Sequence, residues 1–196
     1  LGGIEVAEGN TSQSLSIGGD LINNTTGINY GQPWNPSYSH CDFRNLPITF
    51  FGDNTAYVTN TSGTPVTYFE DVTVDKGSSQ SDSLVVDIEG TLNTPNDNWL
   101  TLKNGTFKYL RNDDLRITEQ SEFTIPATSG LYINSSGNTI YLANDNVNDN
   151  DVFLNGKLSI IQGDVYIGQP GAPNNNNDIE YSGGGNSEID IQGGSL

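Results

Sequence analysis

The sequence predicts an all-β fold, a right-handed parallel β-solenoid, from three observations. Helix signals are nearly absent, because only five alanines are scattered through the 196 residues and no window carries apolar residues at helical spacing. Short segments instead alternate apolar and polar residues, which is the pattern of a strand with one buried face. A glycine follows many of these segments, where a chain that turns from one face of a solenoid to the next needs a tight bend.

The predicted strands are separated by Gly, Asn-Asp and Pro, which favour turns. Each strand places its apolar side chains on one face and is expected to fill one layer of a narrow core. In chain order the predicted strands cover residues 15–17, 48–50, 72–74, 86–88, 100–102, 131–133, 140–142, 152–154, 158–160, 165–167 and 189–191.

A repeated pattern joins these strands into coils. Residues 15–21, 86–92 and 152–158 align with one another: two apolar residues at alternate positions precede a Gly, and a third apolar residue follows it. The same pattern with one additional residue before the Gly occurs in residues 100–107, 158–165 and 189–196. The spacing of these repeats is irregular, which distinguishes them from strictly periodic arrays such as leucine-rich repeats.

A β-sandwich with a similar number of strands is the alternative fold. Sandwiches join paired strands by two-residue turns such as Asn-Gly, whereas the Asn-Gly pairs at 104–105 and 155–156 lie inside the repeated pattern. The hydrophobic content of 33% also favours a solenoid, whose stability grows by stacking neighbouring coils rather than by one large core.

The whole chain, residues 1–196, is expected to form one solenoid segment of a longer protein. Its last repeat stops without the polar or helical cap that a solenoid needs for solubility. Residues 27–47 depart from the repeat, because they are dense in aromatic residues and turn formers, and they are expected to leave the coil as an irregular loop.

The charge balance excludes several classes of partner. The chain carries 24 Asp and Glu against 7 Lys and Arg, a net charge of −17, which argues against nucleic-acid binding and against docking on anionic lipid. No apolar run is long enough to cross a membrane, and a single cysteine rules out an internal disulfide or a multi-cysteine metal cluster. With high Asn and Thr content, this composition suits a protein exported to the surface of a bacterium or beyond it.

Several segments resemble coils of large secreted proteins of the Bacteroidetes. The resemblance lies in the amino-acid sequences of residues 48–54, 58–63, 67–76, 84–92 and 179–185. Such proteins are β-helical and are similar to cargo of the type IX secretion system. The resemblance therefore implies an extracellular or cell-surface location, with the secretion machinery or other surface proteins as partners. It covers roughly residues 11–26 and 48–196 and specifies architecture rather than activity.

Candidate ligand-binding residues come from the aromatic segment. Tyr30, Trp34 and Tyr38 would offer rings on which a sugar stacks, so glycans are a possible class of partner.

A candidate calcium site comes from residues 144–151, where Asn and Asp alternate. Hard cations take carboxylate and amide oxygens, and the expected ligands are Asp145, Asn148, Asp149 and Asp151. The run is not an EF-hand loop, and its alternative interpretation is a polar turn that holds no ion. Residues 171–178 are similar in composition but carry less charge, and they are expected to be a loop tip.

Two sequence patterns resemble catalytic groups, but no catalytic residue is assigned from either of them. Lys103, Lys108, Arg111 and Arg116 lie near Asp113, Asp114 and Glu119, as a lyase or hydrolase would require. The favoured interpretation is alternating charge on solvent-facing strand positions. The run 40–42 places His, Cys and Asp in succession, but neighbouring residues of an extended chain point to opposite faces and make no Cys–His pair.

The sequence therefore predicts a non-enzymatic extracellular or cell-surface β-solenoid that serves as a structural stalk or adhesin segment. The alternative is a carbohydrate-binding or polysaccharide-degrading protein on the same scaffold.

Overall fold

The computed structural model is a right-handed parallel β-solenoid of about five turns, as the sequence predicts. The structure describes residues 13–24, 40–143, 150–168, 177–181 and 186–196. These residues form strands and no helix, and all the strand pairs among them are parallel. The parallel pairing excludes the alternative β-sandwich, whose strands would run antiparallel.

The longest strands are β10, β13 and β15, with 10, 14 and 11 residues, and the others have two to five residues. Their bounds are β1 (Leu15–Ile17), β2 (Leu21–Ile22), β3 (His40–Asp42), β4 (Ile48–Gly52), β5 (Ala56–Thr59), β6 (Val66–Tyr68), β7 (Val72–Lys76), β8 (Ser83–Asp87), β9 (Thr91–Asn93), β10 (Leu100–Tyr109), β11 (Leu115–Arg116), β12 (Phe123–Ile125), β13 (Ser129–Leu142), β14 (Val152–Leu154), β15 (Lys157–Ile167), β16 (Ile179–Tyr181), β17 (Glu188–Ile191) and β18 (Gly194–Ser195).

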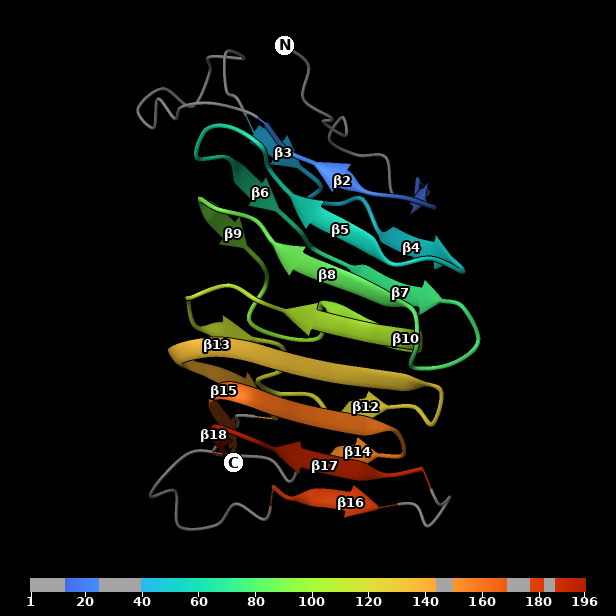
Figure 1. Cartoon of the computed structure of the whole chain (residues 1–196), viewed down its shortest axis with the longest axis vertical. Coiled ribbons are helices and arrows are strands. Elements are labelled where there is room, and N and C mark those ends of the chain that lie inside the picture. The colour runs from blue at the N-terminus through green and yellow to red at the C-terminus, as the bar shows by residue number, and fades with distance from the viewer. Residues whose placement is uncertain (1–12, 25–39, 144–149, 169–176, 182–185) are drawn as a thin grey trace.

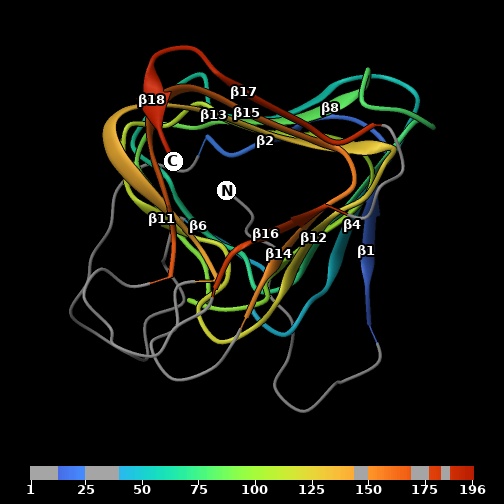
Figure 2. The ribbon, with the colours of Figure 1, turned by 90° about the horizontal axis from the view of Figure 1, so that it is seen from below.

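The coils stack along the long axis of the molecule and enclose the core between three faces (Figures 1 and 2). The first face is built by β1, β4, β7 and the first half of β10, and β12, β14 and β16 continue it. The second face contains β2, β5, β8, the second half of β10, the first parts of β13 and β15, and β17. The third face contains β3, β6 and β9, and then β11, the last parts of β13 and β15, and β18.

Alternation places the apolar residues of each strand inside the coil. Ile48 of β4 is in register with Val72 of β7, which is in register with Leu100 of β10, and all three side chains are buried. The same stacking continues through the later coils, so that the buried apolar residues form one cluster along the axis. Each coil adds one layer to this cluster, which is how a narrow solenoid acquires a core.

Glycine allows the chain to bend sharply between faces, as the repeated pattern predicts. Gly105 lies where β10 passes from the first face to the second, with φ +82°. A Cβ there would lie 2.6 Å from Cβ of Lys76 and 2.8 Å from the carbonyl oxygen of Asp82. Both the left-handed conformation and the close approach of the neighbouring coil require glycine at this corner.

Each predicted strand overlaps an observed strand, but the pattern missed others of the same coils. Strands β5 and β12 were not predicted, although each has buried alternate residues, and β6, in which two adjacent residues are buried, was missed as well. Within the predicted loop 27–47, His40–Asp42 form β3 and pair with β6, while residues 27–39 lie outside the described part of the chain.

Candidate functional site

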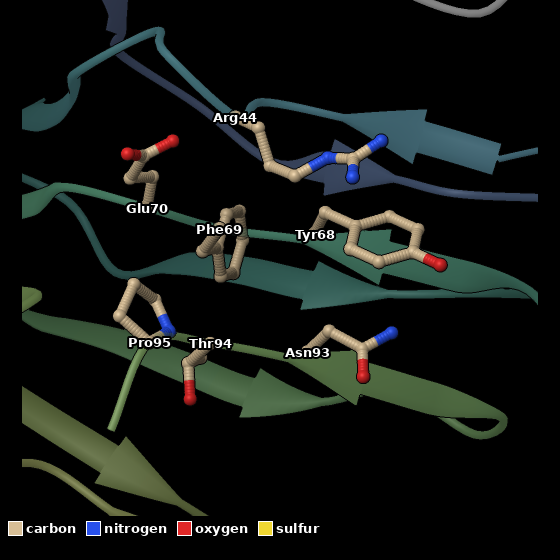
Figure 3. Close-up of a pocket in the computed structure, with 7 residues that line it drawn as sticks. All are labelled: Arg44, Tyr68, Phe69, Glu70, Asn93, Thr94 and Pro95. Carbon is tan, nitrogen blue, oxygen red and sulfur yellow. The ribbon is translucent and has the colours of Figure 1, made fainter.

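A shallow pocket of about 280 Å³ opens on the third face, beside β6 and β9 (Figure 3). Tyr68 and Asn93 are register partners on these two strands, and both are partly exposed. The guanidinium of Arg44 lies over the Tyr68 ring, 4.7 Å from its centroid. The residues that line the pocket are Arg44, Tyr68, Phe69, Glu70, Asn93, Thr94 and Pro95.

The inner side of the pocket belongs to the core. Phe69 is only 3% exposed and its ring stacks on that of Phe43, with the centroids 5.8 Å apart. The backbone N–H of Phe69 donates to the carbonyl oxygen of Asn93 at 2.9 Å, which ties the two pocket-forming segments together. The pocket therefore sits on strands and packed rings rather than on a loop alone.

Glu70 supplies the acidic side of the pocket. Its Oε2 accepts a hydrogen bond from the backbone N–H of Asn45, which lies in the left-handed region with φ 62°. The next residue, Asp71, has a pKa raised by burial and, to a smaller extent, by the charge of Glu70. The pocket thus combines a carboxylate, a guanidinium, an amide and a hydroxyl around apolar carbon.

An aromatic column lies on the third face farther along the axis. Arg116 of β11 is in register with Tyr141 of β13, which is in register with Tyr166 of β15. The guanidinium of Arg116 lies 4.4 Å from the centroid of the Tyr141 ring, and the rings of Tyr141 and Tyr166 meet edge to face at 6.0 Å. These contacts bind three successive coils together on the outside of the solenoid.

The structure brings one of the predicted calcium ligands, Asp151, into an acidic cluster. Oxygens of Asp151, Asp178 and Glu180 all lie within 4.8 Å of one another, and the backbone N–H of Asp178 donates to Oδ1 of Asp151 at 3.1 Å. Carboxylate oxygens at this spacing could hold a divalent cation. The other predicted ligands lie outside the described residues: Asp145, Asn148 and Asp149.

Sequence reasoning missed Asp178 and Glu180. Asp178 was expected to belong to a loop tip, but it stands directly before β16. Because β14 pairs with β16 in parallel, Val152 is opposite Ile179, and the residues that precede them are brought together as well. The pairing of Asp151 with Asp178 could be predicted only with the register of the two coils.

The basic residues that resembled a catalytic group take part in separate contacts. Lys103 is exposed, Lys108 lies 5.5 Å from the ring centroid of Tyr132, and Arg116 forms an ion pair with Glu119 at 3.3 Å. Arg111 is only 8% exposed, which corrects the expectation that all four of these side chains face solvent.

Arg111 connects two coils. Its guanidinium donates to the carbonyl oxygens of Ile88 and Gly90 in the preceding coil and to the carboxylate of Asp113 in its own. The hydroxyl of Tyr109 donates to the same carboxylate, and burial together with Asp113 raises the pKa of Tyr109. Because the guanidinium of Arg111 donates hydrogen bonds to two carbonyl groups and a carboxylate, its role is to hold the two coils together.

Lys76 is a second buried cation. Its side chain lies inside the corner between the first two faces, and Nζ donates to the carbonyl oxygen of Phe51 at 2.6 Å. Burial lowers the pKa of Lys76, while nearby carboxylates, chiefly that of Asp82, act in the opposite direction. The alternation that buries Val72 and Val74 continues to Lys76, so the spacing indicates an inward position although the charge does not.

The predicted aromatic platforms Tyr30, Trp34 and Tyr38 lie outside the described residues. Sequence reasoning did not select Arg44, Tyr68 or Asn93, because the uneven length of the coils hides which outward residues become neighbours. Only the outward-facing aromatic at Tyr68 was a usable signal.

None of the described residues belongs to a helix long and apolar enough to cross a membrane. A scan against protein-family models finds no matching family, and searches of the curated proteins and of the solved structures find no similar protein.

Proposed function

We propose that the chain is a non-enzymatic segment of an extracellular or cell-surface protein, in which the solenoid serves as a stalk with adhesive surfaces. The observation that carries this proposal is the continuous ladder of parallel strands along the axis, from β1 through β4, β7, β10, β13 and β15 to β17. A stack of this kind lengthens by repetition and holds its outer faces at fixed positions.

Buried polar ties support the mechanical part of the proposal. Arg111 links two coils, as described above, and Nδ2 of the buried Asn23 donates to the hydroxyl of Thr67 in the next coil at 2.9 Å. Hydrogen bonds of this type add directional restraint to a core that apolar contacts alone would leave freer to slide.

The surface charge supports the location. A net charge of −17 keeps a long scaffold soluble and repels other acidic surfaces, and divalent cations outside the cell would screen it. The outer faces carry only a few basic side chains, several of which are bound to neighbouring rings or carboxylates.

Single-molecule pulling tests the stalk. Handle proteins fused at the two ends would transmit force through the solenoid, and we expect a series of rupture events rather than one. Register partners such as Ile48, Val72 and Leu100 lie about 24–28 residues apart, so each released coil should lengthen the chain by roughly 80–100 Å.

Two results would oppose the proposal. Unfolding without a measurable force peak would contradict a mechanical role. Release of reducing ends or unsaturated products from a panel of polysaccharides would contradict a non-enzymatic one. An Arg111→Met variant serves as the internal check, because it should weaken the rupture of its own coils and leave the others unchanged.

A further inference from the structure

We propose that the pocket at Arg44, Tyr68, Glu70, Asn93, Thr94 and Pro95 binds one pyranose residue of a neutral glycan. This inference deepens the proposed function, because it rests on the adhesive role of the solenoid and names the ligand class that this role would use. The pocket of about 280 Å³ is at the small end for ligand sites, which suits a single sugar ring.

The pocket has the two kinds of surface that a sugar ring presents. Pro95 and the edge of Tyr68 offer apolar carbon to the C–H face of a pyranose, with the buried ring of Phe69 behind them (Figure 3). Around this carbon stand a carboxylate, a guanidinium, an amide and a hydroxyl. Glu70 accepts hydrogen bonds from sugar hydroxyls, Arg44 donates to ring and hydroxyl oxygens, and Asn93 does both.

The charges of the pocket favour a neutral ligand. Glu70 and Arg44 lie on the same rim and oppose each other in sign, so the pocket provides no net positive charge for a carboxylate or sulfate. The net charge of −17 adds a long-range repulsion against anionic glycans. A hexose without an acid group needs no positive charge in the pocket and is not repelled by the net charge, and two of its hydroxyls can still donate hydrogen bonds to Glu70.

The pocket is largely formed before a ligand arrives. Tyr68 and Asn93 belong to paired strands, the Phe69 N–H holds the Asn93 carbonyl group, and the Asn45 N–H holds Glu70. A site fixed in this way loses little conformational entropy on binding, which lowers the free-energy cost of taking up a ligand. Many such contacts along a surface would add up by multivalency.

A titration followed by backbone amide NMR tests the proposal. The probes are the methyl glycosides of glucose, mannose and galactose, with glucuronate as the anionic comparison. We expect saturable shifts at residues 68–70 and 93–95 for at least one neutral glycoside, with a Kd on the order of 1 mM. Glu70→Gln keeps an oxygen for the Asn45 N–H but removes the charge. This variant and Asn93→Ala should each weaken binding about tenfold.

The controls make the same changes outside the pocket. Glu122→Gln removes one exposed carboxylate and Asn54→Ala removes one exposed amide, and both should leave the Kd within about twofold of the parent. Unchanged amide spectra away from each substitution would show that every variant is folded.

Three results would overturn the inference: shifts that never saturate at the pocket, an unchanged Kd in Glu70→Gln, or tighter binding of glucuronate than of the neutral glycosides. The pulling experiment contains no sugar, so it reports on the stalk alone. Failure of the titration with force peaks intact removes the sugar site and leaves the stalk, whereas the reverse pattern removes the stalk and leaves the sugar site.

Discussion

Alanine substitutions at three glycines in corners of the solenoid allow two contributions to the loss of folding free energy, backbone strain and steric contact, to be measured separately. Gly19 has open space and no positive φ, Gly137 has open space with φ +73°, and Gly105 has φ +82° and close neighbours. Replacing each by alanine adds the same methyl group to three different environments. The differences between the three variants therefore measure backbone strain and steric contact in turn.

The expected magnitudes follow from these environments. Gly19→Ala should be neutral or stabilise by about 0.4–1 kcal/mol, because alanine narrows the unfolded ensemble. Gly137→Ala should cost about 1 kcal/mol, since the left-handed conformation costs an L-residue roughly 1–2 kcal/mol and the unfolded-state effect offsets part of it. Gly105→Ala adds contacts at 2.6–2.8 Å with Lys76 and Asp82, which force the backbone to shift, for a total of about 2–5 kcal/mol.

Urea unfolding followed by tryptophan fluorescence measures these free energies of unfolding. The chain has two tryptophans, and a Trp34→Phe background leaves Trp99 to report on its own coil. Trp99 is 2% exposed and packs on Phe107 of β10, two residues from Gly105, with their rings 6.1 Å apart. Equal losses for Gly105→Ala and Gly137→Ala would refute the steric part of the reasoning, and no loss for Gly105→Ala would refute all of it.

Three further predictions concern buried or clustered charges. Arg111→Met should lower the free energy of unfolding by about 2–4 kcal/mol in thermal or urea unfolding, because it removes the donor from the buried carbonyl group of Ile88 and leaves the Asp113 carboxylate without its ion pair. Lys76 has a folded-state pKa below its unfolded value of 10.5. Between these two pKa values the unfolded chain binds more protons than the folded chain, so the free energy of unfolding should rise with pH toward 10.5. In Lys76→Met this rise should disappear from urea midpoints measured at increasing pH below 10.5. Asp178→Asn should raise the melting temperature in low salt with chelator, because it removes repulsion from Asp151 and Glu180, and calcium should stabilise the parent more than the variant.

Matched substitutions decide each of these three outcomes. Lys103→Met and Asp87→Asn make the same chemical changes at exposed positions, and each should shift stability by no more than about 0.5 kcal/mol. Arg116→Met removes contacts with Tyr141 and Glu119 at a half-exposed position and should cost no more than about 1 kcal/mol. If Arg116→Met lowered the free energy of unfolding as much as Arg111→Met, the assignment of Arg111 as a link between two coils would be contradicted. A pH slope that survives in Lys76→Met would exclude this lysine as its source. Equal responses to calcium in the parent and Asp178→Asn would exclude the acidic cluster as a cation site.

The architecture could be predicted because it depends on local patterns. Alternation fixes which residues point inward, and the Gly after each strand marks the bend, so residues 100–107 already specify both halves of β10 and the corner at Gly105. Strands with weaker alternation were missed. In β6, for example, Val66 and Thr67 are both buried, and no period of two appears.

The candidate sites could not be predicted, because they depend on register between coils of unequal length. Asn93 comes to lie beside Tyr68, and Asp178 beside Asp151, only once the corner loops have taken their particular lengths. Burial of Lys76 agrees with the alternation of β7 but not with its charge, and the sequence does not show the backbone carbonyl groups that accept hydrogen bonds from the inward side chains of Lys76 and Arg111.

The two halves of the molecule turn their corners differently, and this gives them different torsional compliance. Toward the N-terminus, short connections separate the strands of adjacent faces, as between β4 and β5 or between β7 and β8, so a twist about the long axis is absorbed by rotation of loop dihedral angles. Farther along, β13 and β15 each continue through a corner without a connecting loop. Their pairing is irregular between Ile133 and Thr139 but regular on both adjacent faces, so the same twist must strain the hydrogen bonds on either side of the corner. Amide exchange should accordingly be slowest where these two strands pair, and the molecule should wind and unwind first from its N-terminal coils.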